Sequence, residues 1–311
     1  MLTRIGTKMD STKVRFCGVS AAALVAAVAT AGVVLPGAAQ GSVVPTADYY
    51  LPFENPPGSP TGTPTVENFG TIGGTAGIID TTSDGGANFS YSSNTPDGSA
   101  DSGYFAEAQG ETNYPSATLA MPNASGGTTS PWGDSFSLDN NGGAGDQQMT
   151  VDAWVKLPSN KSNVLIAYKG NSRSNQPGWL LQATAGSPLQ FNGYDVNGQT
   201  QLNGSIVLNA GVWTNVAVVV TVGASPSLEF YVNGVANMGG SSPMETLATD
   251  PTDPLMVGGG GAYMDNVRIW GTALTAAQIA DISQVPEPTG ISLVVGLAAG
   301  VLLLRRGRPV A

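Results

Sequence analysis

Met149-Thr-Val-Asp-Ala-Trp-Val-Lys-Leu157 is the stretch that indicates the fold most directly, because positions 149, 151, 153, 155 and 157 are all apolar. A period of two places alternate side chains on opposite faces of a β-strand. The other positions include a threonine, an aspartate and a lysine. We therefore predict a strand that turns one face toward a hydrophobic core.

More strand patterns follow this segment. Val212–Val222 is β-branched and mostly apolar, which predicts a central strand covered on both faces. Leu228–Val232 leads into Asn233-Gly234, the pair preferred in a type I′ hairpin because both positions need a positive φ. The other strands predicted here are Val164–Tyr168, Trp179–Ala183, Leu189–Tyr194, Leu255–Val257 and Met264–Trp270.

Residues 42–147 are rich in Gly, Ser, Thr, Asn and Pro, which predicts long loops between short strands. One short helix closes the chain's β region, where Thr275 and Gln278 have the spacing of a capping box. An almost all-β pattern with frequent turns favours a sandwich or a barrel. The short strands predicted in the first region are Asp48–Phe53, Thr75–Ile79, Ala87–Ser90, Gly103–Phe105 and Ser116–Leu119.

Five segments together resemble the laminin G-like, concanavalin A-like jelly-roll family, in the family's order. They are Met149–Lys156, Ala167–Gly170, Gly211–Val218, Leu228–Gly234, and Met264–Trp270 with Ala273–Ile279. The resemblance implies an all-β fold, a two-sheet antiparallel jelly-roll sandwich, over residues 42–285, with the strongest match over 149–283. Ala47–Glu54 resembles the family's opening strand more weakly. Thr214-Asn215 stands where the family usually continues with histidine.

The N-terminal residues 1–41 run from basic to apolar to small residues, the order of a secretory signal peptide. Cleavage after Ala39 or after Gly41 fits equally well, and Met1 or Met9 could be the true start. Cys17 is the only cysteine and would be removed, so the exported domain would have no disulfide.

The C-terminal residues combine Val285-Pro286-Glu287-Pro288, an apolar segment over 289–304, and the basic cluster Arg305, Arg306 and Arg308. Residues 286–311 resemble the PEP-CTERM sorting signal of Gram-negative bacteria, which implies a transmembrane helix and removal by an exosortase. The basic cluster would stay on the cytoplasmic side, with the domain outside. An ordinary C-terminal anchor is the alternative, although the apolar run is shorter than the roughly 20 residues of a standard span.

Charge narrows the choice of partners. Residues 42–284 contain five basic and 20 acidic residues, a net charge near −15. Such a surface repels phosphate backbones, so nucleic acid is not an expected partner. The acidic residues would suit either divalent cations or solubility outside the cell.

The composition also argues against catalysis. The chain has no histidine and would keep no cysteine after processing, which excludes His-dependent triads and His-based metal centres. Glycosidases of related folds need two carboxylates flanking the sugar bond, and no Glu-x-Asp-x-Glu strand pattern occurs. We predict no catalytic residues, with a glycoside hydrolase using an unrecognised carboxylate pair as the alternative.

Two kinds of binding site remain. A calcium ion could use Asp265 and Glu54, although Asp265 could instead tie a loop to its strand and pair with Arg268. Sugar rings could stack on aromatic side chains, for which burial is the alternative. The candidates for stacking are Trp132, Trp179, Tyr194 and Tyr263, whereas Trp154, Trp213 and Trp270 are predicted core residues.

Because fold alone does not give function, the sequence leaves several hypotheses. The first is a non-catalytic binding or adhesion module, exported to the cell envelope or the extracellular matrix, that binds polysaccharide or a surface protein. Signal peptidase and an exosortase would process it. The alternatives are a glycan-active hydrolase and a structural matrix protein without a specific ligand.

Overall fold

The computed structural model describes residues 42–54, 66–80, 89–96, 101–105, 117–121, 136, 148–159, 164–170, 178–195, 198–222, 226–240 and 255–284. They all belong to one compact unit, Ser42–Ala311. The predicted signal peptide, the sorting motif and the segment 289–304 lie outside the described residues. Within the described ranges, no helix is both long and apolar enough to cross a membrane.

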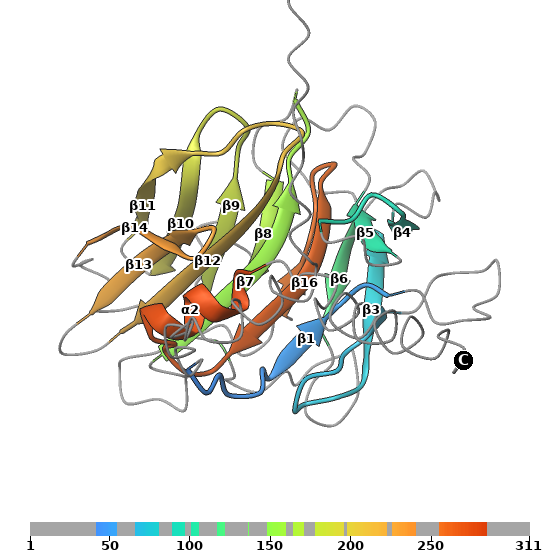
Figure 1. Cartoon of the computed structure of the whole chain (residues 1–311), viewed down its shortest axis with the longest axis horizontal. Helices are drawn as coiled ribbons and strands as arrows, with labels where there is room; N and C mark the ends of the chain where they lie inside the picture. Colours follow the sequence, from blue (N-terminus) through green and yellow to red (C-terminus); the bar gives the residue numbers. More distant parts are fainter. Residues whose placement is uncertain are drawn as a thin grey trace, which may run out of the picture. The chain divides into compact units, whose positions relative to one another are not determined.

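The first sheet, called sheet 1, has eight strands in the order β14-β13-β12-β7-β16-β5-β4, with β1 paired to β16 (Figure 1). All of its pairings are antiparallel. Its strands are β1 (Tyr49–Leu51), β4 (Phe89–Ser92), β5 (Ser102–Phe105), β7 (Gln148–Lys156), β12 (Trp213–Thr221), β13 (Ser227–Val232), β14 (Val235–Gly240) and β16 (Tyr263–Trp270).

The second sheet, called sheet 2, also has eight antiparallel strands, in the order β11-β10-β9-β8-β15-β6-β3-β2. Its strands are β2 (Val66–Glu67), β3 (Thr75–Asp80), β6 (Ala117–Ala120), β8 (Val164–Lys169), β9 (Gly178–Ala183), β10 (Pro188–Asp195), β11 (Gly198–Val207) and β15 (Leu255–Val257). Most strands expected from the sequence are present. β2 and β11 were not predicted.

One hydrophobic core joins the two sheets. Met149, Val151 and Val155 of β7 belong to it, together with Leu181 of β9 and Phe191 of β10. The alternation in β7 therefore points its apolar set toward sheet 2, as predicted. Two antiparallel sheets packed around a shared core form a β-sandwich, which confirms the predicted all-β architecture.

The single described helix, α2 (Ala276–Ile282), covers part of the outer face of sheet 1 (Figure 1). Thr275 is its N-cap and forms the predicted capping box with Gln278. A second hydrophobic cluster lies beneath the helix. It consists of Ala47, Ala217, Val219, Tyr231, Trp270, Leu274, Ile279 and Ile282.

Strand β12 shows why this cover matters. It pairs with β7 on one side and β13 on the other, and Val216 and Val218 face the main core. Ala217 and Val219 face the second cluster instead. The predicted burial of both faces is thus confirmed. The hairpin that follows is also as expected, with φ of 49° at Asn233 and 73° at Gly234.

Candidate functional site

The two predicted calcium ligands lie in different surroundings. Asp265 in β16 is completely buried, and its Oδ1 accepts a hydrogen bond from the backbone N–H of Asn266 at 2.7 Å. Glu54 follows β1 and is exposed. Within the described ranges, no group of three or more His, Cys, Asp or Glu side chains could hold a metal ion. Calcium binding stays a prediction from the sequence.

Arg268 pairs with Asp152 of the neighbouring strand. The Nη2 of Arg268 lies 3.1 Å from Asp152 Oδ2, and Asn215 Nδ2 donates to Asp152 Oδ1 at 2.8 Å. Arg268 also donates to the backbone carbonyl of Ile282 at 3.0 Å, at the end of α2. Burial raises the pKa of the Asp152 carboxyl, whereas Arg268 and Asn215 act in the opposite direction. This group lies on the covered part of sheet 1 and ties the helix to the sheet.

The predicted stacking residues have different outcomes. Trp132 lies outside the described residues, as does the side chain of Tyr194. Trp179 is completely buried, and its Nε1 donates to the carbonyl of Phe136 at 2.6 Å. It is not available to a ligand, so its predicted role as a stacking surface does not hold. Tyr263 is half-buried on the outer face of sheet 1, so it remains a candidate.

Tyr263 belongs to a line of residues across four neighbouring strands. It pairs with Tyr104 of β5 on one side and with Lys156 of β7 on the other, and Lys156 pairs with Trp213 of β12. The rings of Tyr104 and Tyr263 have centroids 4.7 Å apart, and those of Trp213 and Tyr263 are 6.5 Å apart. We call these four residues, Tyr104, Tyr263, Lys156 and Trp213, the aromatic row.

Asn94 joins two members of the aromatic row. Its Oδ1 accepts a hydrogen bond from Lys156 Nζ at 3.0 Å and another from Trp213 Nε1 at 3.2 Å. Trp213 is half-buried on the outer face, so the prediction that it is a core residue is wrong. Trp154 and Trp270 are buried as predicted.

A depression of about 340 Å³ lies at one end of the aromatic row. Tyr104, Lys156 and Tyr263 form part of its lining. The other lining residues come from the ends of strands and their loops: Leu157, Pro158, Ser159, Ala210, Gly211 and Gly261.

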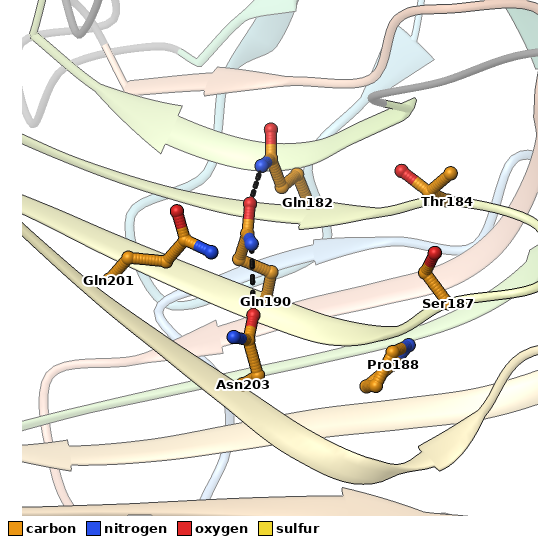
Figure 2. Close-up of a pocket in the computed structure, with 7 residues that line it drawn as sticks. All are labelled: Gln182, Thr184, Ser187, Pro188, Gln190, Gln201 and Asn203. Carbon is orange, nitrogen blue, oxygen red and sulfur yellow. Dashed lines mark hydrogen bonds between the residues drawn. The ribbon is translucent and has the colours of Figure 1, made fainter.

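A second depression, of about 260 Å³, lies on sheet 2 and was not foreseen from the sequence. Figure 2 shows the side chains of Gln182, Gln190 and Asn203 in a line across it. Gln182 donates to Gln190, and Gln190 donates to Asn203 Oδ1 at 2.9 Å. We call this depression the amide groove; its lining consists of Gln182, Thr184, Ser187, Pro188, Gln190, Gln201 and Asn203.

The cross-strand register explains the line of amides. Gln190 in β10 pairs with Gln182 in β9 and with Asn203 in β11. Leu189 and Phe191, on either side of Gln190, belong to the core. Gln190 therefore faces outward, together with its two neighbours. The sequence signal was this alternation of glutamine with core residues, but β11 had to be recognised as a strand for the groove to appear.

Neither depression has an acidic residue in its described lining. Glycoside hydrolysis usually requires two carboxyl groups on either side of the scissile bond. The lining amides and hydroxyls can donate and accept hydrogen bonds. The arrangement is therefore suited to binding polar groups, and the described lining offers no acid–base pair.

Comparison with known proteins supports the predicted fold. Residues 126–280 match the model of the concanavalin A-like lectin/glucanases superfamily. No curated protein sequence matches the chain significantly.

Among solved structures, similar ones include binding domains of toxins. The binding domain of botulinum neurotoxin DC in complex with rat synaptotagmin II has a TM-score of 0.52 and 10% identity, covering 76% of this chain and 51% of that chain. The binding domain of Paraclostridial Mosquitocidal Protein 1 has a TM-score of 0.50 and 12% identity, covering 76% of this chain and 52% of that chain. This chain thus spans about half the length of those structures. At such identities the likeness shows the fold alone, and the concanavalin A-like description rests on the family model that residues 126–280 match.

Proposed function

We propose that the protein is an exported, non-catalytic binding module that recognises neutral polysaccharide through the amide groove. The observation that carries this proposal is the line of Gln182, Gln190 and Asn203 across three adjacent strands. The described lining of the groove carries no charge, although the domain has a net charge near −15.

The chemistry of the lining suits sugar hydroxyls. Each amide side chain presents two donors and an acceptor carbonyl, and a hydroxyl can also donate and accept. Gln201 and Asn203 are exposed and Gln190 is half-buried, so a ligand could exchange hydrogen bonds with the ladder. Thr184 and Ser187 add two hydroxyl groups on the side of the groove opposite Gln201 (Figure 2). A neutral polyhydroxy chain matches these groups without burying a charge.

The test is affinity electrophoresis of the purified full-length protein in gels that contain neutral glucans, mannan or galactan. We expect retardation in at least one gel, and Gln190→Ala should weaken it about tenfold because several hydrogen bonds are lost. Gln148→Ala is the matched control, since Gln148 is an exposed glutamine on sheet 1. Equal retardation of Gln190→Ala and the wild type, or no retardation in any gel, would overturn the proposal.

The same electrophoresis can test calcium binding, for which Asp265 and Glu54 are the proposed ligands, by repeating it with Ca²⁺ and with a chelator. Retardation that disappears with a chelator and returns with Ca²⁺ would support a calcium-dependent module. Retardation that is unchanged by the chelator would overturn the calcium proposal and leave the proposal for the amide groove intact.

The proposed location rests on the two ends of the sequence. Signal peptidase would remove residues 1–41. An exosortase would recognise Val285-Pro286-Glu287-Pro288 and remove the C-terminal segment, which would leave the domain in the envelope or the matrix. Replacing Arg305, Arg306 and Arg308 with neutral residues should impair sorting. Unchanged processing and localisation of that variant would contradict the sorting proposal.

A further inference from the structure

We infer that the depression at the aromatic row is a second binding site, independent of the amide groove, for a sugar residue that carries a carboxylate. It lies on the outer face of sheet 1, whereas the amide groove lies on sheet 2. The two sites differ in chemistry, because the described lining of the groove is uncharged and Lys156 lines the depression.

Lys156 is an unusual cation in this domain. Among the basic residues that the structure describes, Lys169 is buried and Arg268 is engaged with Asp152. Lys156 is half-buried, lines a depression, and forms no ion pair with a carboxylate in the described part of the chain. Its Nζ has three N–H donors, and Asn94 accepts one of them. The remaining donors can meet an anionic oxygen.

The aromatic side chains indicate what carries the anion. Lys156 Nζ lies 6.0 Å from the centroid of the Tyr263 ring, and Tyr104 packs against that ring. Aromatic side chains with a polar tip offer both apolar contact and a hydroxyl group. The C–H groups of a sugar ring can pack on the aromatic rings, and its hydroxyls can form hydrogen bonds with the tyrosine hydroxyl groups. A carboxylate on that ring would form a charge-assisted hydrogen bond with the ammonium group.

The rim of the depression leaves room for such a ring. Ala210 and Gly211 are part of its lining, and a Cβ added to Gly211 would meet no atom within 4 Å. Gly261 has a φ of 78°, which an L side chain rarely adopts, so the loop before β16 stays small at this point.

The net charge of the domain limits the ligand further. A polyanion would be repelled by a surface with a net charge near −15. At physiological ionic strength, salt screens the electrostatic interaction of a single charge beyond about 8 Å. Lys156 therefore attracts only a group placed within the depression. The ligand class is therefore an isolated sugar acid in an otherwise neutral glycan.

The test compares methyl β-D-glucuronide with methyl β-D-glucoside by titration into the full-length protein. We expect the wild type to bind the glucuronide at least about tenfold more tightly, since a hydrogen bond to a charged group exceeds a neutral one by that margin. Lys156→Gln should abolish this preference, and Lys156→Arg should keep it. No preference in the wild type, or a preference unchanged in Lys156→Gln, would overturn the inference.

A second readout locates the site. The indole N–H resonance of Trp213, assigned through Trp213→Phe, should shift with the glucuronide because Trp213 and Lys156 share Asn94. Saturable binding that leaves this resonance in place would contradict the inference, even if Lys156→Gln were unstable. Gln190→Ala should still bind the glucuronide, and Lys156→Gln should still bind neutral polysaccharide, so failure of either proposal is distinguishable from failure of the other.

Discussion

The outer faces of the two sheets differ in what covers them. On sheet 1, α2 and the segment before β1 cover one part, where Tyr231 and Trp270 lie beneath them. The first described residue, Ser42, also bonds to the helix through Asp281, with its N–H and hydroxyl 2.7 and 2.6 Å from Oδ2. On sheet 2, the groove at the β9–β10–β11 end of the outer face carries half-buried and exposed amides instead.

This difference separates stability from binding. A covered face buries apolar area and removes polar groups from water, so each of its residues contributes strongly to folding. An open polar face contributes little to folding, and its side chains can exchange partners with a ligand. The comparison predicts large losses of stability from substitutions under α2 and small ones from substitutions in the amide groove.

The largest effect is expected for Asp152→Ala. Removing the carboxylate leaves Arg268 and the amide of Asn215 without their shared partner, and breaking a buried pair costs about 3–5 kcal/mol. The free energy of unfolding, measured with urea, should fall by that amount. Asp152→Asn keeps the size and a hydrogen-bonding group, so its loss should be smaller. Equal stability of Asp152→Ala and the wild type would show that this part of sheet 1 does not anchor the helix.

Asp152 also predicts a dependence on pH. Its pKa is raised in the folded state because burial disfavours the charged form. A raised pKa contributes stability that is fully present below the unfolded-state pKa and is lost as pH rises through the folded-state pKa. The wild type should therefore lose stability relative to Asp152→Asn as the pH increases from the unfolded-state pKa of this carboxyl toward its raised folded-state pKa. A constant difference between the two proteins across the acid range would contradict the raised pKa.

An intermediate effect is expected where the two sheets meet at their edges. Asn237 of β14 is buried, and its Oδ1 accepts hydrogen bonds from the N–H groups of Ser205 and Ile206 in β11 at 3.0 and 2.9 Å, and from the Ser205 hydroxyl. Asn237→Ala should lower the free energy of unfolding by about 1–3 kcal/mol, because these donors lose their acceptor. Asn209→Ala, at an exposed asparagine, is the control. A loss no greater than that of the control would mean that Asn237 does not join the sheets.

Much of this fold follows from patterns within the sequence. The alternation in β7, the Asn233-Gly234 turn and the capping box at Thr275 each depend on neighbouring residues, so local physics was enough to predict them. β11 was missed because its glycines and amides are poor strand formers. It is an edge strand whose pairing with β10 is set by the rest of the sheet.

The candidate site was harder to predict, although the alternation of side chains along the strands already indicated part of it. Trp179 lies an even number of positions from Leu181 and Ala183 in the same strand, so its side chain points to the same side, the core. Trp213 lies an odd number of positions from Val216 and Val218, so its side chain points away from the core, to the outer face. Assigning each tryptophan to a face from the alternation along its strand would have corrected both predictions. The convergence of Asn94 on Lys156 and Trp213 has no such signal, because it joins residues 62 and 119 positions apart.

The smallest effect on folding is expected for Gln190→Ala, the substitution that also tests glycan binding. Gln190 is half-buried, and its hydrogen bonds with Gln182 and Asn203 join side chains on an open part of the face, so water can replace them. The free energy of unfolding should change by less than about 0.5 kcal/mol. If Gln190→Ala destabilised the protein as much as Asn237→Ala, the amide ladder would be holding the strands together. A weaker affinity for polysaccharide would then reflect a damaged sheet, and the division between a stabilising face and a binding face would fail.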